Sequence, residues 1–497
     1  MTTSFVNTSA RKPTKFDYNL IVIGAGAGGL VSSYIAAAVK AKVVLIERHK
    51  MGGDCLNTGC VPSKALIRSA RLISDARNSM HFGIANMPAQ FDFADIMERV
   101  QRVVRQVEPH DSIARYESLG VECITGDARI TSPWEVEVNG KTITGRAIIV
   151  ATGAKPLVPK LPGLDQIRYL TSDTLWNLRV LPKRLLVLGG GPIGCELAQA
   201  FARFGAQVTI VEQADKLLAR EDADVSSALR TAMEADGVTL ALSHKAIEFR
   251  SSSSGNGALI AESQGPDNQA EKVEFEFDEV IIALGRKANV DGFGLQELGV
   301  KISERGTISA DRLLRTNVPS ISVCGDVTGP YQFTHVAAHQ AWFAAVNQLL
   351  APFWSFKVDY RVIPHATFTE PQVARVGINE TEAKAQGIAY ALTHYGIDDL
   401  DRAIADGHAH GFIKVLTKPG TDQILGVTIM SAEAGELIAE FVLAMKWRLG
   451  LNKILGTIHA YPTMMEANKY VAGNWKRAHA PQRLLAWAKR YFAFRRG

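Results

Sequence analysis

Short apolar runs, glycine-rich turns and helix-like stretches follow one another along this 497-residue chain. The first apolar run, at residues 20–23, leads into glycines, then into an alanine-rich stretch at residues 31–41 and a second apolar run at residues 42–47. Short apolar runs bounded by turn residues are typical of buried strands, and the stretch between them has the length of a helix. The pattern predicts a strand, a glycine turn, a helix and a second strand.

The same order of elements returns at residues 184–212, RLLVLGGGPIGCELAQAFARFGAQVTIVE. Further apolar runs at residues 145–151 and 278–283 read as additional strands. After residue 360 the chain instead reads as several strands followed by an amphipathic helix at residues 435–450. We therefore predict an α/β fold with two doubly wound, Rossmann-like domains and an appended C-terminal α+β domain. The polar segment at residues 251–257, SSSSGNG, predicts a turn or a hairpin tip.

Both glycine turns have the spacing GxGxxG of a dinucleotide-binding fingerprint. The glycines are Gly24, Gly26 and Gly29 in the first unit and Gly189, Gly191 and Gly194 in the second. An acid ends each unit, Glu47 in the first and Glu212 in the second. The glycines let the backbone approach a pyrophosphate at a helix N-terminus, and the acid accepts hydrogen bonds from a ribose. Two such sites predict two dinucleotides, because a nicotinamide delivers hydride that a flavin can receive; the alternative is a structural glycine turn.

Glu212 also bears on the choice of nicotinamide cofactor. An acid at this position binds a free 2′-hydroxyl group and repels a 2′-phosphate, which favours NADH over NADPH. Lys216 and Arg220 follow at a distance and keep NADPH open.

Composition excludes several classes of protein. A hydrophobic content of 47% and a charged content of 21% are ordinary for a globular protein. No apolar run is long enough to span a bilayer and no secretory signal is evident, so we expect a cytoplasmic protein. The net charge of +5 is too mild to indicate nucleic acid.

Two of the five cysteines, Cys55 and Cys60, stand close together in MGGDCLNTGCVPSK. A zinc site would need two more ligands at short spacing, and the nearest histidine, His49, stands alone, so we expect no metal site. In a reducing compartment a close pair is more often catalytic than structural. A helix is predicted to start just after Cys60, and a helix N-terminus lowers the pKa of a thiol. The alternative is two buried cysteines that never bond.

From about residue 17 to residue 470, the chain resembles the flavin-dependent pyridine nucleotide-disulfide oxidoreductases, with a core similar to mercuric reductase and dihydrolipoamide dehydrogenase. The resemblance rests on GGDCLNTGCVPSK, GGGPIGCELA, CGDVTG, FTEPQVARVG and PTMMEANK, in this order. It implies FAD and NADH or NADPH as cofactors, and a homodimer. The implied domains are FAD-binding at 16–158 and 288–358, NAD(P)-binding at 159–287, dimerisation at 359–473 and a basic tail at 474–497.

The resemblance also implies roles for individual residues. Cys55 would exchange electrons with the substrate, Cys60 would lie beneath the flavin, and Lys64 would pair with Glu196 where hydride arrives. The implied FAD site comprises Gly24, Gly26, Gly29, Glu47, Gly53, Lys64, Thr152, Gly153, Asp326 and His335. For His335 a structural contact with the flavin is favoured over a catalytic role. The implied NAD(P) site comprises Gly189, Gly191, Gly194, Glu212 and Gly285. Tyr461 and Glu466 of the partner subunit would complete each site.

The sequence departs from the family at the position of the general base. Dithiol reductases of this kind carry a His-Pro pair there, whereas this chain has Tyr461 and retains Glu466. A tyrosine, with an ordinary pKa near 10, is a poor base at neutral pH, which disfavours dihydrolipoamide as substrate. A tyrosine here is a feature of mercuric reductases, yet no cysteine follows Cys324 and no N-terminal CxxC metal-binding domain is present. The acceptor therefore stays open among a disulfide, a metal ion, a reactive oxidant and a quinone.

The last residues are basic, free of acids and rich in aromatic side chains. From Gln482, helical spacing places on one side Leu484, Leu485, Ala488, Tyr491 and Phe492. Such a helix suits an anionic membrane surface, here the inner face of the cell membrane; packing against the protein itself and a solvated tail are the alternatives. Two rival functions follow: a membrane-surface NADH:quinone oxidoreductase with dispensable cysteines, and a non-catalytic flavin-bound subunit that docks through the tail.

Overall fold

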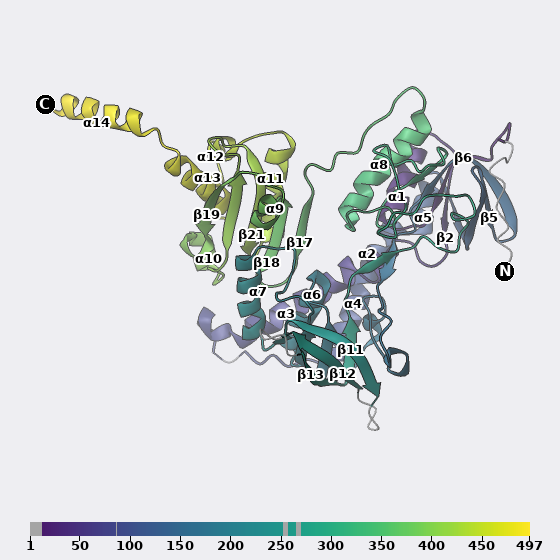
Figure 1. The fold of residues 1–497 in the computed structure, drawn as a ribbon, viewed down its shortest axis with the longest axis horizontal. Coiled ribbons are helices and arrows are strands. Elements are labelled where there is room, and N and C mark those ends of the chain that lie inside the picture. Colours follow the sequence, from purple (N-terminus) through teal and green to yellow (C-terminus); the bar gives the residue numbers. More distant parts are fainter. Residues whose placement is uncertain (1–11, 86, 252–256, 265–269) are drawn as a thin grey trace.

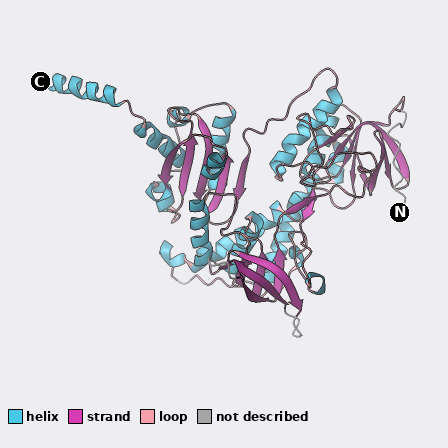
Figure 2. Ribbon diagram, in the orientation of Figure 1, coloured by secondary structure: helices cyan, strands magenta, loops and turns pink. Residues whose placement is uncertain are grey.

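The computed structural model describes residues 12–497 except residue 86 and segments 252–256 and 265–269. The chain forms three bodies, each built on its own sheet, and a final helix that lies apart from them (Figure 1). Figure 2 shows that helices accompany all three bodies. Within the described part of the chain, no helix combines the length and the apolar character needed to cross a membrane.

The first body is a parallel sheet in the order β3–β2–β1–β6–β16. Its strands are β1 (Tyr18–Ile23), β2 (Val43–Glu47), β3 (Val121–Thr125), β6 (Lys141–Val150) and β16 (Ile321–Val323), with β4 (Ala128–Ser132) and β5 (Glu135–Val138) paired antiparallel to the start of β6. Leu20 and Val22 lie in one hydrophobic cluster and Ile21 and Ile23 in another. Because residues 20–23 of β1 are buried on both faces of the sheet, they form a continuous apolar run.

Helices cover this sheet and extend from it. They are α1 (Ala27–Ala38), α2 (Gly53–Asn57), α3 (Cys60–Arg77), α4 (Phe93–Val107), α5 (Ile113–Ser118) and α8 (Thr334–Leu350). Short 3₁₀ turns occur at η1 (Ser79–Phe82), η2 (Glu108–Asp111), η3 (Leu164–Gln166), η4 (Leu175–Asn177) and, in the third body, η5 (Ile397–Asp399). α1 and α8 pack against each other although they are far apart in the sequence (Figure 1).

The second body repeats the design with the parallel order β10–β9–β8–β14. Its elements are β8 (Arg184–Leu188), α6 (Pro192–Phe204), β9 (Gln207–Val211), α7 (Ala223–Ala235), β10 (Thr239–Ala241) and β14 (Glu279–Ile282). An antiparallel sheet of β11 (His244–Ser251), β12 (Gly257–Gln264) and β13 (Ala270–Phe277) is attached. β11 and β12 pair as a hairpin, and the predicted tip lies mostly outside the described residues.

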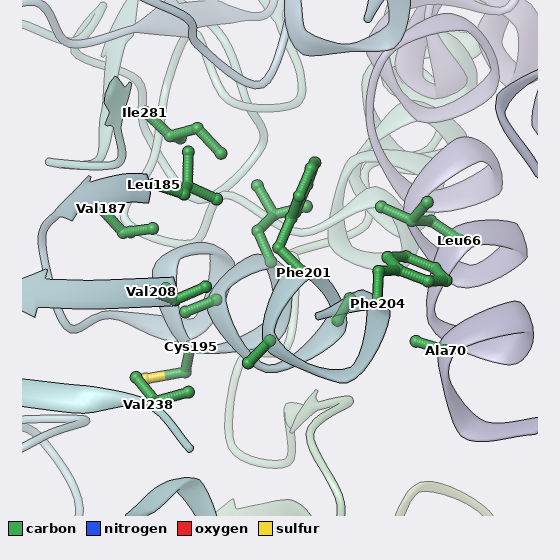
Figure 3. Packing of buried hydrophobic residues seen from close by; sticks show 14 of the residues in the cluster. Leu66, Ala70, Leu185, Val187, Cys195, Phe201, Phe204, Val208, Val238 and Ile281 are labelled. Atoms are coloured by element: carbon green, nitrogen blue, oxygen red, sulfur yellow. The ribbon is translucent and has the colours of Figure 1, made fainter. Parts of the chain in front are cut away.

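A shared core fixes α3 of the first body to α6 of the second. Phe201 and Phe204 of α6 face Leu66 and Ala70 of α3 in one buried cluster (Figure 3). The two bodies are also joined by the antiparallel ribbon of β7 (Ala154–Pro156) and β15 (Arg286–Ala288). The helix that follows the cysteine pair therefore packs on the second nucleotide-binding unit.

The third body is an antiparallel sheet in the order β17–β18–β21–β20–β19. Its strands are β17 (Pro364–Thr367), β18 (Gln372–Gly377), β19 (Ala391–Gly396), β20 (Phe412–Thr417) and β21 (Ile424–Ser431), and its helices are α9 (Glu380–Ala385), α10 (Asp401–Ala405), α11 (Ala434–Lys446), α12 (Leu451–Leu455) and α13 (Glu466–Ala478). The helix predicted at residues 435–450 ends earlier, at Lys446, because Arg448 adopts a left-handed conformation with φ of 57°. A final helix, α14 (Gln482–Arg496), follows.

A buried lysine connects the second and third bodies. The Nζ atom of Lys414 lies 3.0 Å from the Asp222 carboxylate and 2.8 Å from the carboxylates of Asp224 and Glu380. Asp222 and Asp224 stand at the start of α7, whereas Lys414 belongs to β20. A buried charge is stable only with close partners, so this cluster ties the two bodies together.

Candidate active site

The first glycine loop has the geometry of a phosphate cradle. Gly24 has a φ of 99°, and a Cβ atom there would lie 2.5 Å from the Ala151 carbonyl oxygen. A Cβ atom at Gly29 would lie 1.7 Å from the Gly24 carbonyl oxygen, so α1 can pack this closely on β1 only with glycine. At Gly26 the nearest atom would be 3.9 Å away. The loop thus leaves open the one position where a pyrophosphate approaches the backbone.

The second loop reproduces this geometry. Gly189 has a φ of 115°, and a Cβ atom at Gly194 would lie 2.0 Å from the Gly189 carbonyl oxygen. At Gly191 no atom lies within 4 Å of an added Cβ. Each loop leads into the N-terminus of a helix of 12 or 13 residues, which favours negative charge. The residues present therefore fit a dinucleotide at both sites.

The acids that end the two units make matching contacts. The Glu47 carboxylate accepts hydrogen bonds from the backbone N–H groups of Ala25 (2.7 Å) and His49 (2.8 Å). The Glu212 carboxylate accepts them from Gly190 (2.6 Å) and Ala214 (2.8 Å). Each carboxylate is thereby oriented beside its glycine loop, and its oxygens keep further acceptor capacity for ribose hydroxyl groups.

Two further glycines of the predicted sites adopt left-handed conformations with open space at Cβ. Gly153 has a φ of 65° and Gly285 a φ of 102°, and neither would bring an added Cβ within 4 Å of another atom. Thr152 turns its hydroxyl away from this space and donates to the Asn289 carbonyl at 2.8 Å. Its side chain therefore holds the bend between the first two bodies.

Asp326 lies at the same junction. Arg286 is 3.6 Å from its carboxylate, donates to the Ala154 carbonyl at 2.7 Å and pairs with Asp54 beside Cys55. Burial raises the pKa of Asp326 to about 6, against the opposing effect of Arg286. A buried carboxyl group in this position can bind hydroxyl groups of a flavin side chain.

Cys55 and Cys60 lie on two consecutive helices. Cys55 belongs to the short α2, and Cys60 is the first residue of the 18-residue α3. Gly52 precedes α2 with a φ of 87°, and the Asn57 amide donates to the carbonyls of Met51 and Gly53 at 2.9 Å. The loop is thus held by its own side chains, and both cysteines are free thiols.

The two thiols have opposite proton affinities. A hydrogen bond from Cys55, together with Thr334 and Lys64, lowers the pKa of Cys60 to about 6 against the effect of burial. The same hydrogen bond raises the pKa of Cys55 well above the usual range, with burial adding to the effect. At neutral pH the pair therefore consists of a Cys60 thiolate and a Cys55 thiol, at the N-terminus of α3 where negative charge is favoured.

Thr334 was not identified from the sequence. Its hydroxyl oxygen lies 3.5 Å from the Cys60 sulfur, and Thr334 is the first residue of α8. The hydroxyl lowers the pKa of both thiols. The contact joins residues 274 positions apart, so no local pattern could have indicated it.

Lys64 and Glu196 meet beside the cysteines. The Lys64 Nζ atom lies 2.8 Å from Glu196 Oε2, and Lys64 also lies 4.3 Å from the centre of the Phe368 ring. The other Glu196 oxygen accepts the backbone N–H of Phe368 at 2.8 Å. Lys64 comes from α3 and Glu196 from α6, so this ion pair joins the two nucleotide-binding units. Phe368 opens the stretch FTEPQVARVG, but nothing in the sequence assigned it a contact with Lys64.

His335 occupies a structural setting. Its Nε2 atom is 2.9 Å from the Pro364 carbonyl oxygen, and its ring stacks on Phe333 at 5.4 Å. The ring of His365 also stacks on Phe333, with the two ring centres 5.7 Å apart. Burial lowers the pKa of His335, so the ring is neutral at physiological pH.

Tyr461 and Glu466 belong to the third body, where Glu466 is the first residue of α13; α13 lies apart from α2, which carries Cys55 (Figure 1). Tyr461 is 68% exposed and donates to Asp401 at 3.0 Å, which raises its pKa above the ordinary value. Glu466 is buried and accepts from Tyr470 at 3.3 Å. His459 lies 2.9 Å from the Glu440 carboxylate. Tyr461 is therefore an exposed residue of the third body, and its raised pKa does not suit a base at neutral pH.

Among the side chains that the structure describes, no group of three or more His, Cys, Asp and Glu residues is placed to hold a metal ion.

Comparisons with known proteins agree with this geometry. Residues 18–341 match the family described as pyridine nucleotide-disulphide oxidoreductase, and residues 363–472 match its dimerisation domain. A dihydrolipoyl dehydrogenase of Chlamydia muridarum is 34% identical over 460 residues, covering 90% of this chain and 95% of that protein. A mercuric reductase of Bacillus cereus is 33% identical over 463 residues, covering 91% and 71%.

A solved structure has the same fold. The Cu(II) complex of RclA, an HOCl-induced flavoprotein disulfide reductase from Escherichia coli, matches with a TM-score of 0.81 and 26% identity, and the match covers 92% of this chain and 99% of that one.

Proposed function

The chain belongs to the pyridine nucleotide-disulphide oxidoreductases, FAD-dependent enzymes that use NAD(P)H. We propose that it passes electrons from NADH, through FAD and the Cys55–Cys60 pair, to a thiol-reactive acceptor: a disulfide, a metal ion or another oxidant. The opposite pKa shifts of the two thiols, beside the Lys64–Glu196 pair, carry this proposal. The match to the dimerisation domain makes a homodimer the expected assembly.

The two glycine loops supply the binding sites. When bound, FAD accepts hydride from the nicotinamide and can pass two electrons to a disulfide. Gly24, Gly26 and Gly29 would hold the FAD pyrophosphate, and Gly191 would face that of the nicotinamide dinucleotide. Glu212 favours NADH through its negative charge, and the Nζ atom of Lys216 is held by the Glu221 carbonyl, 2.5 Å away.

The cysteine pair would reduce a disulfide acceptor without an external base. Cys55 bonds to one acceptor sulfur while the acceptor S–S bond breaks. The leaving sulfur takes the proton that Cys55 gives up. Cys60 then attacks Cys55, which restores the Cys55–Cys60 disulfide and releases the second acceptor sulfur, protonated by solvent. Two electrons have moved from the dithiol to the acceptor.

A dithiol substrate such as dihydrolipoamide is a poor fit to this site. Such a substrate must itself be deprotonated, and Tyr461, with its raised pKa, cannot act as a base at neutral pH. His459 does not replace it, because it is engaged with Glu440. An acceptor that binds directly to thiolate, such as a disulfide or a soft metal ion, needs no such base.

A quinone acceptor is a second candidate, favoured by the exposed aromatic and basic helix α14. In that case the cysteines would be dispensable. Cys55→Ser should then leave quinone reduction intact, whereas reduction of a disulfide or a metal ion should be lost.

An anaerobic titration tests the main proposal. We would reduce the full-length flavoprotein with NADH, and separately with NADPH, and count the cysteines that become open to alkylation by mass spectrometry. Wild-type protein should take up two electron pairs and gain alkylation at Cys55 and Cys60, whereas Cys55→Ser and Cys60→Ser should take up one. Uptake of a single pair by the wild type, without new thiols, would refute the proposal.

A further inference from the structure

Helix α14 presents two distinct faces. At 100° per residue, one half of its circumference carries Leu484, Leu485, Trp487, Ala488, Tyr491, Phe492 and Phe494. The opposite half carries Arg483, Lys489, Arg490 and Arg496. Arg495 falls within the apolar half, one residue before the helix ends, where a long side chain can extend its charge back toward water. This division is that of an amphipathic helix at an interface.

No described residue of the chain covers the apolar half of α14. Its side chains include Trp487 at 61%, Phe492 at 60% and Phe494 at 84% exposure, and no residue of α14 is buried. Trp487 and Tyr491 stack on one another at 5.5 Å, with nearly parallel rings. The helix projects away from the three bodies (Figures 1 and 2). A contiguous apolar surface of this kind marks a binding surface.

The charge of α14 identifies the chemistry of its partner. The helix has five basic residues and no acid, and Lys476 and Arg477 precede it at the end of α13. Fifteen residues give a length of about 22 Å, too short and too charged to span a bilayer but long enough to lie along its surface. Pairing of two copies of α14 would bring cationic rims together, which disfavours self-association.

We propose that α14 lies in the headgroup region of an anionic membrane, with its aromatic half toward the acyl chains and its basic half toward lipid phosphates. Aromatic side chains favour this depth, and each lysine or arginine near an anionic surface strengthens binding about fivefold. The matched family domains end at residue 472, so α14 is an addition to the oxidoreductase.

Flotation with lipid vesicles tests this inference. The full-length flavoprotein would be mixed with vesicles of phosphatidylcholine alone, or of phosphatidylcholine with phosphatidylglycerol. We expect binding only with the anionic lipid, and weaker binding as salt is raised. The triple variant R483E/K489E/R490E should bind at least about a hundredfold more weakly, with unchanged NADH oxidation by a soluble acceptor.

A matched pair of substitutions tests the orientation. Trp487→Asp and Ala486→Asp change the charge equally, on the apolar and the polar half respectively. We expect vesicle binding to weaken about 30-fold for Trp487→Asp, which also removes the ring proposed to insert into the membrane. For Ala486→Asp we expect about fivefold weaker binding. Equal losses of vesicle binding in the two variants would contradict the insertion of the aromatic half into the membrane.

Deletion of residues 482–497 tests whether α14 binds a membrane or a second copy of the chain. Loss of vesicle binding with an unchanged molecular mass in light scattering supports the proposal. Vesicle binding that survives the deletion would overturn it. The proposal would also be overturned if the full-length protein does not bind anionic vesicles and the deletion variant is a monomer. In that case α14 would be a contact between copies of the chain.

Discussion

Residues of α2 lie against the glycine loop of the first nucleotide-binding unit, whereas no atom lies within 4 Å of an added Cβ at the matching position, Gly191, of the second loop. A Cβ atom on Gly53 would lie 2.7 Å from the Gly26 Cα atom, so the start of α2 rests on the first loop. In the second unit, an added Cβ at Gly191 meets nothing within 4 Å, and Pro192 and Ile193 are exposed. The same local design therefore has two different surroundings.

This difference suits two kinds of ligand. A loop with a second segment beside it can retain a cofactor through many turnovers, and that segment, α2, carries Cys55. An open loop can exchange a co-substrate in every turnover. The Lys64–Glu196 pair joins the two units at the point where they must cooperate. The predictions below test this division of roles.

The largest effect is expected at the third glycine of each unit. Gly29→Ala would force a Cβ to within 1.7 Å of a backbone oxygen, and Gly194→Ala to within 2.0 Å. Overpacking against backbone should destabilise each unit by about 3 kcal/mol. Gly29→Ala should lose bound flavin on gel filtration, whereas Gly194→Ala should keep it and lose binding of NADH. Loss of flavin from both variants alike would remove the distinction between the units.

The ion pair between the units comes next. Lys64→Met leaves the buried Glu196 carboxylate without its partner, and we expect NADH-dependent reduction to slow about 100-fold. Glu196→Gln should have a similar effect, and the double variant should be little worse than either single one. Stopped-flow absorbance would measure these rates. Fully additive effects would show that the two residues act independently.

Nicotinamide preference should change about tenfold with Glu212→Gln. The substitution removes a negative charge that repels the 2′-phosphate of NADPH, so kcat/KM for NADPH should rise relative to NADH. Glu47→Gln is the matched control, because Glu47 makes the same backbone contacts in the first unit. A change of nicotinamide preference in the Glu47→Gln control would show that Glu47 and Glu212 do not serve two different dinucleotides.

The smallest effect concerns Thr334. Thr334→Val removes the hydroxyl near Cys60, and a hydrogen bond to a charged group contributes about 1.5–3 kcal/mol. The Cys60 pKa, about 6 with Thr334 in place, should then rise by about one unit. Because the thiolate exists above this pKa, its ultraviolet absorbance should disappear at a higher pH as acid is added. Thr334→Ser should behave like the wild type, and an unchanged Thr334→Val titration would exclude the hydroxyl from this role.

Much of the local structure could be predicted from the sequence. The apolar run at residues 20–23 forms a strand buried on both faces, and the GxGxxG spacing produces left-handed turns at Gly24 and Gly189. Helix α3 begins at Cys60 itself, one residue earlier than predicted. These features depend on neighbouring residues, so they appear in the sequence as short periodic patterns.

The environment of the cysteines could not be predicted from such patterns. Thr334 reaches Cys60 from the start of α8, and Phe368 reaches Lys64 from the third body. The buried Lys414 bonds to acids about 190 positions away, and nothing in its strand sequence distinguishes it from a surface lysine. Contacts across such separations leave no local trace.

The sequence by itself determined the two nucleotide-binding units, the cysteine pair and the division of α14 into an aromatic and a basic half. Backbone conformation and helical spacing follow from adjacent residues, so the order of residue types suffices for them. Only the tertiary structure decided which groups shift the pKa of each thiol, which glycine loop has α2 beside it and that no described residue covers α14. These properties depend on burial and on distances between segments remote in the sequence, which exist only once the chain has folded.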